Sequence, residues 1–251
     1  MQEIYKITPD TLLDSDYFLK YIVPNTKNNY YWSDVWSEAF YIDLAKLGFI
    51  ATSYDTPEGL VLLPELQFSY AVLFFENLHI SKKVKRLLQQ NNYELSFNRR
   101  FYDVLDGLED FHKYNWLKGE YRNLLERLKK GSYDNFSLIS VELVLKDSDE
   151  LVAAEVGYVI GKTYTSLSGF SSRAKKYRNY GTLQLVLLAQ YLQKEGFAFW
   201  NLGHPHMAYK KHLGATILER NKFLAIWSKE KNYFGKANFC VTSSPSALKK
   251  R

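Results

Sequence analysis

The stretch LVAAEVGYVI, residues 151–160, decides the fold of this chain, because the segments on both sides repeat its character. Residues 138–145 before it and residues 163–170 after it are also rich in β-branched and aromatic residues. Short turns join the three segments, at Asp147-Ser148-Asp149 and at Gly161-Lys162. Such segments, separated by short turns, are typical of antiparallel strands. The sequence therefore predicts a three-stranded antiparallel meander.

The segments after the meander alternate between helical and extended patterns. Apolar residues recur at helical spacing from about Gly181 to Lys194, and residues 197–202 are strand-like. A short helix is expected near residues 205–212, and a further strand over residues 218–227. This order resembles that of the acetyltransferase-like (GNAT) fold. We therefore predict an α/β (α+β) protein with a GNAT-like C-terminal domain.

Three amphipathic helices are predicted before the meander. Ser81 is placed to cap the first helix and Asn98 to cap the second, since both side chains accept hydrogen bonds at helix N-termini. Apolar stripes mark the second and third helices, and we expect them in the core. The stripes consist of Phe101, Val104, Leu105 and Leu108, and of Tyr121, Leu124, Leu125 and Leu128.

Residues 1–66 are rich in aromatic and turn residues, and they predict a small N-terminal α/β subdomain. Its one clear helix carries Trp36, Phe40, Leu44 and Leu47 at helical spacing and ends at Gly48. We expect residues 67–240 to form the GNAT-like domain and residues 241–251 to be a basic tail.

Composition restricts the function without naming it. The chain has 251 residues, 46% of them hydrophobic, and a formal net charge of +6, which favours a polyanionic partner. No apolar run reaches the roughly 20 residues of a membrane span. The single cysteine, Cys240, excludes an internal disulfide, and the five histidines lack metal-ligand spacing. We expect a cytoplasmic protein with no metal site and no membrane partner.

Four short motifs suggest a family. They are Leu78-His79-Ile80-Ser81-Lys82-Lys83-Val84-Lys85-Arg86, Tyr93-Glu94-Leu95-Ser96-Phe97-Asn98, Trp116-Leu117 and Asp149-Glu150-Leu151-Val152. In this order they resemble the bacterial leucyl/phenylalanyl-tRNA–protein transferases. The resemblance covers roughly residues 60–227. It implies transfer of an amino acid from charged tRNA to the N-terminal α-amine of acceptor proteins, which creates degradation signals (N-degrons). It also implies no cofactor beyond the aminoacyl-tRNA, and we expect a monomer.

The resemblance assigns the tRNA contact to a basic helix. Lys82, Lys85 and Arg86 lie at positions i, i+3 and i+4, so they share one helical face. They match basic positions of the family's tRNA-binding helix, and Arg173 matches an arginine in a Ser-Arg context. The alternative is that this face is merely solvated.

The resemblance also locates the aminoacyl pocket. Glu155 occupies the position of a cavity methionine, within the otherwise apolar stretch of residues 153–160. A carboxylate in an apolar pocket needs a cationic partner, which suggests an arginyl donor ahead of leucyl or phenylalanyl. The alternative is that Glu155 faces solvent. Tyr164, Trp116 and Phe170 complete the expected pocket, although Trp116 fits a core position as well.

The family's catalytic pair does not carry over to this chain. Its glutamate falls on Ser168 or Leu167, and its glutamine falls on Gly203 or His204. We take Ser168 as the candidate catalytic residue at the first position. We take His204 at the second, because imidazole titrates near neutrality. His206 is a neighbouring option, and a purely structural histidine is the alternative.

Two further motifs keep other functions open. Asn201-Leu202-Gly203, followed by Met207-Ala208-Tyr209-Lys210, resembles the arginyl-tRNA–protein transferases, and Arg99–Arg100 would then suit an acidic acceptor. Arg178-Asn179-Tyr180-Gly181-Thr182 resembles half of the pyrophosphate loop of acetyltransferases, but Leu183 replaces its second small residue. The opposed hypotheses are a CoA-dependent acetyltransferase and a tRNA-binding protein that has lost catalysis.

Overall fold

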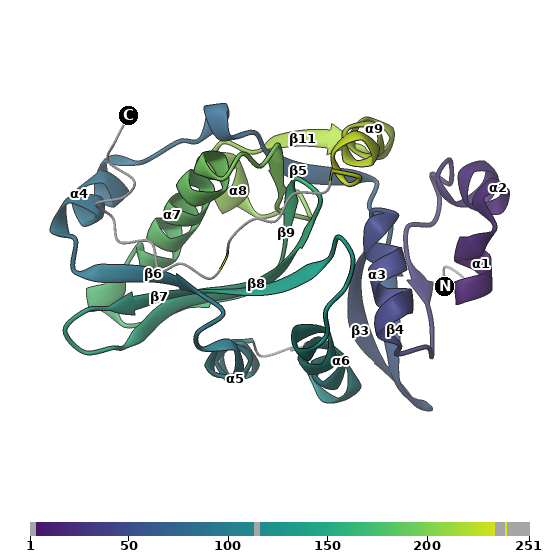
Figure 1. The fold of residues 1–251 in the computed structure, drawn as a ribbon, viewed down its shortest axis with the longest axis horizontal. Helices are drawn as coiled ribbons and strands as arrows, with labels where there is room; N and C mark the ends of the chain where they lie inside the picture. The colour runs from purple at the N-terminus through teal and green to yellow at the C-terminus, as the bar shows by residue number, and fades with distance from the viewer. Residues whose placement is uncertain (1–3, 113–115, 234–238, 240–251) are drawn as a thin grey trace.

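The computed structural model describes residues 4–112, 116–233 and 239. A seven-stranded mixed sheet runs through it, with helices on both faces (Figure 1), which confirms the predicted mixed α/β class. The strand order is β11-β5-β10-β9-β8-β7-β6. The bounds are β5 Ser69–Leu73, β6 Tyr93–Phe97, β7 Ser137–Leu145, β8 Leu151–Ile160, β9 Thr163–Ser171, β10 Phe199–Asn201 and β11 Thr216–Glu219.

The predicted meander forms the middle of this sheet. Strands β7, β8 and β9 pair antiparallel in sequence order, and a bulge between Val156 and Gly157 shifts the register of β8 against β9. Strand β8 is buried on both faces, which explains why its sequence is apolar apart from Glu155 and does not alternate. Strand β10 returns parallel to β9, with helix α7 (Tyr180–Lys194) as the crossover.

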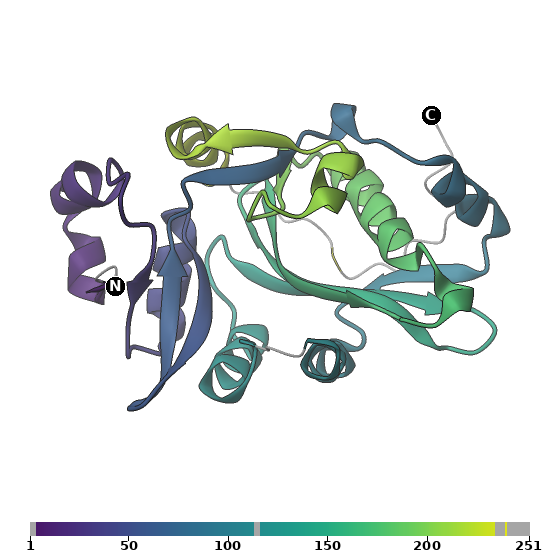
Figure 2. The same ribbon diagram turned by 180° about the vertical axis from the view of Figure 1, so that it is seen from behind.

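Helices cover the two faces of the sheet in separate groups (Figure 2). Helix α7 packs on one face together with α4 (Lys82–Gln90), and α5 (Phe101–Phe111) and α6 (Gly119–Lys130) pack on the other. The two apolar stripes predicted for α5 and α6 are buried. Short helices lie at Phe75–Asn77 and Lys175–Tyr177, and α8 (Ala208–Leu213) precedes β11. None of the described helices is long and apolar enough to cross a membrane.

The N-terminal segment packs beside the end of the main sheet. Its predicted helix forms as α3 (Glu38–Lys46), where Phe40 and Leu44 are buried. The hydroxyls of Tyr41 on α3 and Tyr121 on α6 lie 3.0 Å apart, so the segment shares buried contacts with the rest of the molecule. The domain boundary at residue 66 stays a prediction, and residues 241–251 lie outside the described residues. The remaining elements are β1 Tyr5–Lys6, α1 Pro9–Leu13, α2 Ser15–Tyr17, a π-helix Phe18–Ile22, β2 Tyr31–Trp32, α3 Glu38–Lys46, β3 Ile50–Thr56 and β4 Gly59–Glu65.

The strand predicted over residues 218–227 is wrong for most of its length. Only its first residues belong to β11, and helix α9 (Arg220–Glu230) follows at once. Phe223 and Trp227 are one helical turn apart and both buried, and the Phe223 ring stacks on Tyr70 at 3.8 Å between centroids. That i, i+4 spacing is the helical signal.

The two helix caps predicted from the sequence have different outcomes. Ser81 does cap α4, because its Oγ accepts the Val84 N–H at 3.3 Å. The Asn98 cap is wrong. Asn98 has a left-handed backbone (φ +61°), and its Oδ1 accepts the Ser140 N–H at 3.1 Å and the Lys129 ammonium at 2.5 Å. Its side chain therefore joins β7 and α6.

Candidate active site

The candidate site lies where two parallel strands separate. Strand β10 pairs with β9 only along Thr163–Thr165, whereas β9 continues to Ser171. The later part of β9 therefore lacks a neighbouring strand on that side, and a pocket of about 570 Å³ opens there. Its lining residues are Phe111, His112, Trp116, Ala154, Glu155, Ser166, Leu167, Ser168, Gly169, Phe170, Ser171, Gly181, Thr182, Gln184, Leu185, Leu202, Met207, Tyr209 and Lys210.

Three aromatic side chains contribute to the wall of the pocket, beside several polar residues. Phe111 and Trp116 come from the end of α5 and the segment after it, while Phe170 lies on β9. Gly107 makes this arrangement possible, because a Cβ at Gly107 would lie 2.5 Å from the Phe170 ring. Trp116 and Phe170 thus line one pocket, and their role in holding an aminoacyl group stays a prediction. Such walls favour an uncharged apolar substrate group.

A buried carboxylate forms part of the pocket floor. Glu155 is 3% exposed, so the solvent-facing alternative is wrong. Its carboxylate accepts hydrogen bonds from Tyr164 Oη (2.8 Å), Ser166 Oγ (2.8 Å) and Gln184 Nε2 (3.4 Å). Burial raises the pKa of Glu155 to about 6, although these three donors act to lower it. Tyr164, which the sequence predicted as a pocket residue, is not among the lining residues and reaches the pocket only through its hydrogen bond to Glu155.

Gly157 allows the Tyr164 side chain to reach that carboxylate. A Cβ at Gly157 would lie 2.5 Å from the Tyr164 hydroxyl and 2.4 Å from the Thr165 carbonyl oxygen. The bulge beside Gly157 shifts the β8 register at the same place. A glycine and a bulge together therefore aim Tyr164 and Ser166 at Glu155.

A buried lysine also lines the pocket, and sequence reasoning missed its importance. Lys210 on α8 is 4% exposed, and its ammonium donates to the carbonyl oxygens of Leu202 (2.5 Å) and His204 (2.7 Å). Burial lowers the pKa of Lys210 to about 8, and the negative charge of Glu155 opposes that shift. The pocket thus contains a buried anion and a buried cation.

The two predicted catalytic residues are not brought together. Ser168 lines the pocket, with its Oγ 3.5 Å from Nε2 of His112, a residue that sequence reasoning also missed. His204 is not among the lining residues. Its Nε2 lies 3.7 Å from Glu65 Oε1, and its buried Nδ1 has no hydrogen-bond partner among the described residues. The catalytic roles of Ser168 and His204 stay predictions.

The predicted tRNA face is exposed on α4. Lys82, Lys85 and Arg86 are all exposed, and Lys83 beside them is exposed too. Within the described part of the chain, none of these four side chains forms an ion pair. Arg173 is exposed near the pocket, where its guanidinium donates to the Phe111 carbonyl oxygen (2.6 Å) and covers the Phe111 ring.

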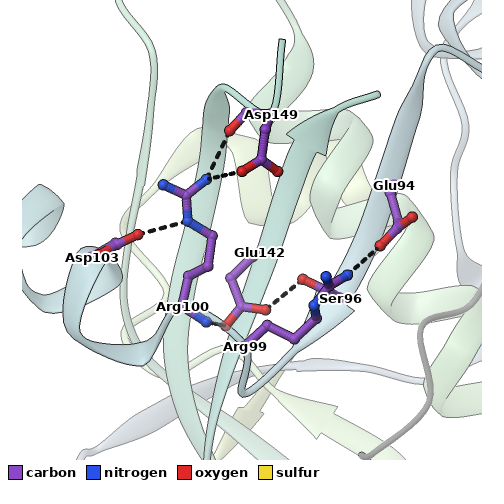
Figure 3. Close-up of polar contacts among 7 residues, drawn as sticks. All are labelled: Glu94, Ser96, Arg99, Arg100, Asp103, Glu142 and Asp149. Atoms are coloured by element: carbon purple, nitrogen blue, oxygen red, sulfur yellow. Dashed lines mark hydrogen bonds and ion pairs between the residues drawn. The ribbon is translucent and has the colours of Figure 1, made fainter. Parts of the chain in front are cut away.

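The second basic cluster is neutralised by acidic neighbours (Figure 3). Arg99 pairs with Glu94 at 2.7 Å, and Arg100 pairs with Asp103 at 2.6 Å and with Asp149 at 3.7 Å. Neither arginine lines the pocket. Their charges are therefore already balanced, which weakens the case for an acidic acceptor at this place.

A fully buried carboxylate lies beneath that cluster. Glu142 on β7 accepts hydrogen bonds from Ser96 Oγ at 2.7 Å and from the Arg100 N–H at 3.4 Å. The Ser140 hydroxyl donates to it as well, at 2.6 Å. Glu142 thus ties the start of α5 to β6 and β7, which is a structural role.

The remaining motifs contribute little at this site. In the acetyltransferase-like loop, Asn179 has a left-handed backbone (φ +72°), and Leu183 is fully buried inside α7. Residues 4–112, 116–233 and 239 contain no group of three or more His, Cys, Asp or Glu side chains that could hold a metal ion.

Comparison with known proteins places the chain in a family. The family model for leucyl/phenylalanyl-tRNA protein transferases matches residues 72–228, which include the whole pocket. The chain belongs to this family. The leucyl/phenylalanyl-tRNA–protein transferase of Pseudomonas putida is 28% identical over 155 residues, covering 61% of this chain and 64% of that protein. That of Aromatoleum aromaticum is 30% identical over 165 residues, covering 63% and 65%. The matched part thus spans slightly less than two thirds of these relatives.

Solved structures similar to this transferase-family chain are more distant. FemX has a TM-score of 0.44 and 12% identity, covering 84% of this chain and 74% of FemX. The structure of L-PGS from Bacillus licheniformis has a TM-score of 0.40 and 14% identity, covering 78% of this chain and 58% of that one.

Proposed function

We propose that this chain transfers leucine or phenylalanine from charged tRNA to the N-terminal α-amine of acceptor proteins. The observation that carries the proposal is the pocket at the free edge of β9, which contains the rings of Phe111, Trp116 and Phe170 and lies wholly within the family match. Aminolysis of an aminoacyl ester needs little chemical activation, so a pocket that positions the ester beside an amine supplies much of the rate. The product would carry a new N-terminal residue that serves as an N-degron.

The state of Glu155 favours an apolar donor over arginine. Its oxygens already accept three hydrogen bonds from Tyr164, Ser166 and Gln184, so no bidentate site is left for a guanidinium. The buried ammonium of Lys210 lines the same pocket and would repel a second cation. The arginyl preference inferred from sequence loses its main support, and Leu or Phe takes its place in the proposal.

The tRNA body would be held outside the pocket. The exposed face of Lys82, Lys85 and Arg86 suits phosphate contacts that carry no base specificity. Arg173, bound to the Phe111 carbonyl near the pocket, would meet the phosphate of the tRNA end. Trp116 offers a ring on which the terminal adenosine would stack.

The GNAT-like assignment is part of the same proposal. Its support is the order β7-β8-β9-α7-β10, with a parallel β9–β10 pair that separates at the pocket. Binding a ligand where parallel strands separate is consistent with transfer of an acyl group to an amine. The alternative of CoA as donor has weaker support. Its pyrophosphate loop needs a second small residue after Gly181, and the buried Leu183 stands there.

The test is a transfer assay with separately charged, labelled Leu-, Phe- and Arg-tRNA. The acceptors are peptides that begin with Arg, Lys, Asp or Glu. The proposal predicts labelled peptide with Leu or Phe, and much less with Arg. Label arriving only from Arg-tRNA would overturn the donor assignment. Transfer from acetyl-CoA with no use of charged tRNA would assign the chain to the acetyltransferases, and tRNA binding without any transfer would support lost catalysis.

A further inference from the structure

Lys210 has a feature that its structural contacts do not explain. A lysine ammonium carries three protons, and the Leu202 and His204 carbonyl oxygens accept two of them. Among the described residues no hydrogen-bond acceptor is recorded for the third, and the Tyr209 ring lies 5.9 Å from the ammonium. The side chain is 4% exposed and lines the pocket beside the free edge of β9. A buried cation with one free donor is thus presented to the ligand space.

The surroundings hold this ammonium in place and charged. The segment that supplies its two carbonyl acceptors, residues 202–204, follows directly after β10, so the strand end fixes the ammonium. The Glu155 carboxylate on β8 is close enough to favour the charged form of Lys210. Glu155 is itself held by Tyr164, Ser166 and Gln184, so the anion does not move to form a closed ion pair. The arrangement is a preorganised positive group at the pocket.

We propose that Lys210 is a catalytic residue whose ammonium binds the carbonyl oxygen of the aminoacyl ester and stabilises the oxyanion formed during transfer. The inference rests on the proposed function. The acceptor α-amine attacks the ester carbonyl carbon, a C–N bond forms, and the carbonyl electrons move to the oxygen held by Lys210. When the tetrahedral intermediate collapses, the C–O bond to the terminal ribose breaks. The proton lost from the amine nitrogen ends on the ribose oxygen.

This role gives Glu155 a definite task as a positioning residue. Its negative charge keeps Lys210 protonated and therefore able to stabilise the oxyanion. It also explains why a carboxylate is tolerated where an apolar floor is expected. The carboxylate supports the cation and does not contact the donor side chain.

The pH dependence of transfer provides the distinguishing readout. Transfer needs a neutral acceptor amine and a charged Lys210, whose pKa is about 8. The rate should therefore rise with pH and then fall as Lys210 loses its proton. The other charged or titratable groups around Lys210 are Glu155 on β8, Tyr164 on β9, His204 and His206 in the loop, and Tyr209. Burial lowers the pKa of His204 and raises that of Tyr209 to about 12, so neither titrates in the same range.

The experiment compares single-turnover transfer of Leu from charged tRNA by wild type, Lys210→Met, Lys210→Gln, Lys210→Arg and Glu155→Gln. Exposed Lys211 on the same helix supplies the matched control, Lys211→Met. Loss of the oxyanion partner should lower the rate at saturating tRNA by about 100-fold or more in the Met and Gln variants, with tRNA affinity within about threefold. Lys210→Arg should keep most of the activity and lose the alkaline fall. Glu155→Gln should move that fall to lower pH.

The outcomes separate the two proposals. A wild type that transfers Leu or Phe, with Lys210→Met and Lys210→Gln within about threefold of its rate, overturns the role of Lys210 and leaves the function intact. The role of Lys210 is also overturned if Lys210→Arg is as slow as Lys210→Met and its rate still falls at the same alkaline pH as that of the wild type. A wild type that transfers nothing overturns both. If Lys210→Met does not fold, the shift of the alkaline fall in Lys210→Arg and Glu155→Gln decides the matter.

Discussion

Two sets of charges in this molecule differ in what surrounds them. Glu155 and Lys210 are buried in the pocket, where Glu155 accepts hydrogen bonds from side chains and Lys210 donates to backbone carbonyl oxygens. Lys82, Lys85 and Arg86 on α4 are exposed, and among the described residues they have no acidic partner. Buried, fixed charges suit chemistry in a dry site, whereas exposed, unpaired charges suit a mobile polyanion. Changes in the first set should alter rate and stability, and changes in the second set should alter affinity and its salt dependence.

The largest effect on stability is expected from Glu155→Met. The change leaves the donors of Tyr164, Ser166 and Gln184 buried without an acceptor, at about 1–3 kcal/mol for each unsatisfied group. We expect the free energy of unfolding to fall by about 3 kcal/mol in total, measured by urea denaturation. Glu155→Gln retains an acceptor and should lose less. Equal stability of the Met variant and the wild type would show that the carboxylate is not held as described.

A pH series sharpens the same point. Glu155 has a pKa raised to about 6 in the folded protein from 4.5, so the folded state binds its proton more tightly than the unfolded state does. Its contribution to stability is therefore complete below about pH 4.5 and is lost as pH rises through 6. Relative to Glu155→Gln, the free energy of unfolding of the wild type should fall by about 2 kcal/mol across that window. A wild type that becomes more stable relative to Glu155→Gln as the pH rises would contradict this sign.

The next effect concerns the exposed set. Replacing Lys82, Lys85 and Arg86 together by Ala should weaken tRNA binding by about tenfold and reduce the slope of log affinity against log salt by about 2–3. Binding titrations between about 50 and 200 mM salt measure both. Thermal stability should hardly change, because these side chains are exposed and unpaired. An unchanged salt slope would remove α4 from the tRNA interface.

The smallest effect is expected from the neutralised cluster. Arg99 and Arg100 are as basic in sequence as the α4 residues, yet both pair with acidic neighbours. Arg99→Ala should change tRNA affinity by less than about twofold, and the Arg99–Glu94 pair should contribute about 0–1 kcal/mol to stability. Filter binding and urea denaturation would check this. A large loss of affinity here, matching that of the α4 variant, would break the distinction between paired and unpaired clusters.

Much of this picture follows from local sequence signals. The meander, α7, the apolar stripes, the Ser81 cap and the exposed basic face all depend on spacing within one element. The pocket positions of Trp116, Glu155 and Phe170 came from the family resemblance. What failed depended on contacts between distant segments. Asn98 accepts hydrogen bonds from Ser140 and Lys129 and does not cap the helix that follows it.

Strand β5 (SYAVL) is short, and no alternation of apolar and polar residues marks it in the sequence. Lys210 lies near Glu155 because the chain turns away after the short strand β10 and leaves the β9 edge free, and His112 lies near Ser168 because α5 packs on β9. No pattern within a single helix or strand records where a neighbouring strand ends. The buried cation of the pocket therefore had to be found in the folded protein.

The most direct test of this division between buried and exposed charges compares two variants in one assay. The single-turnover rate of Leu transfer is measured at saturating charged tRNA, alongside tRNA affinity, for the triple α4 variant and for Lys210→Met. We predict that the α4 variant keeps the wild-type rate within about twofold while binding tRNA more weakly, and that Lys210→Met binds tRNA normally while losing about 100-fold in rate. The contrary result is an α4 variant that is slow even at saturation, together with a Lys210→Met variant whose only defect is weaker tRNA binding.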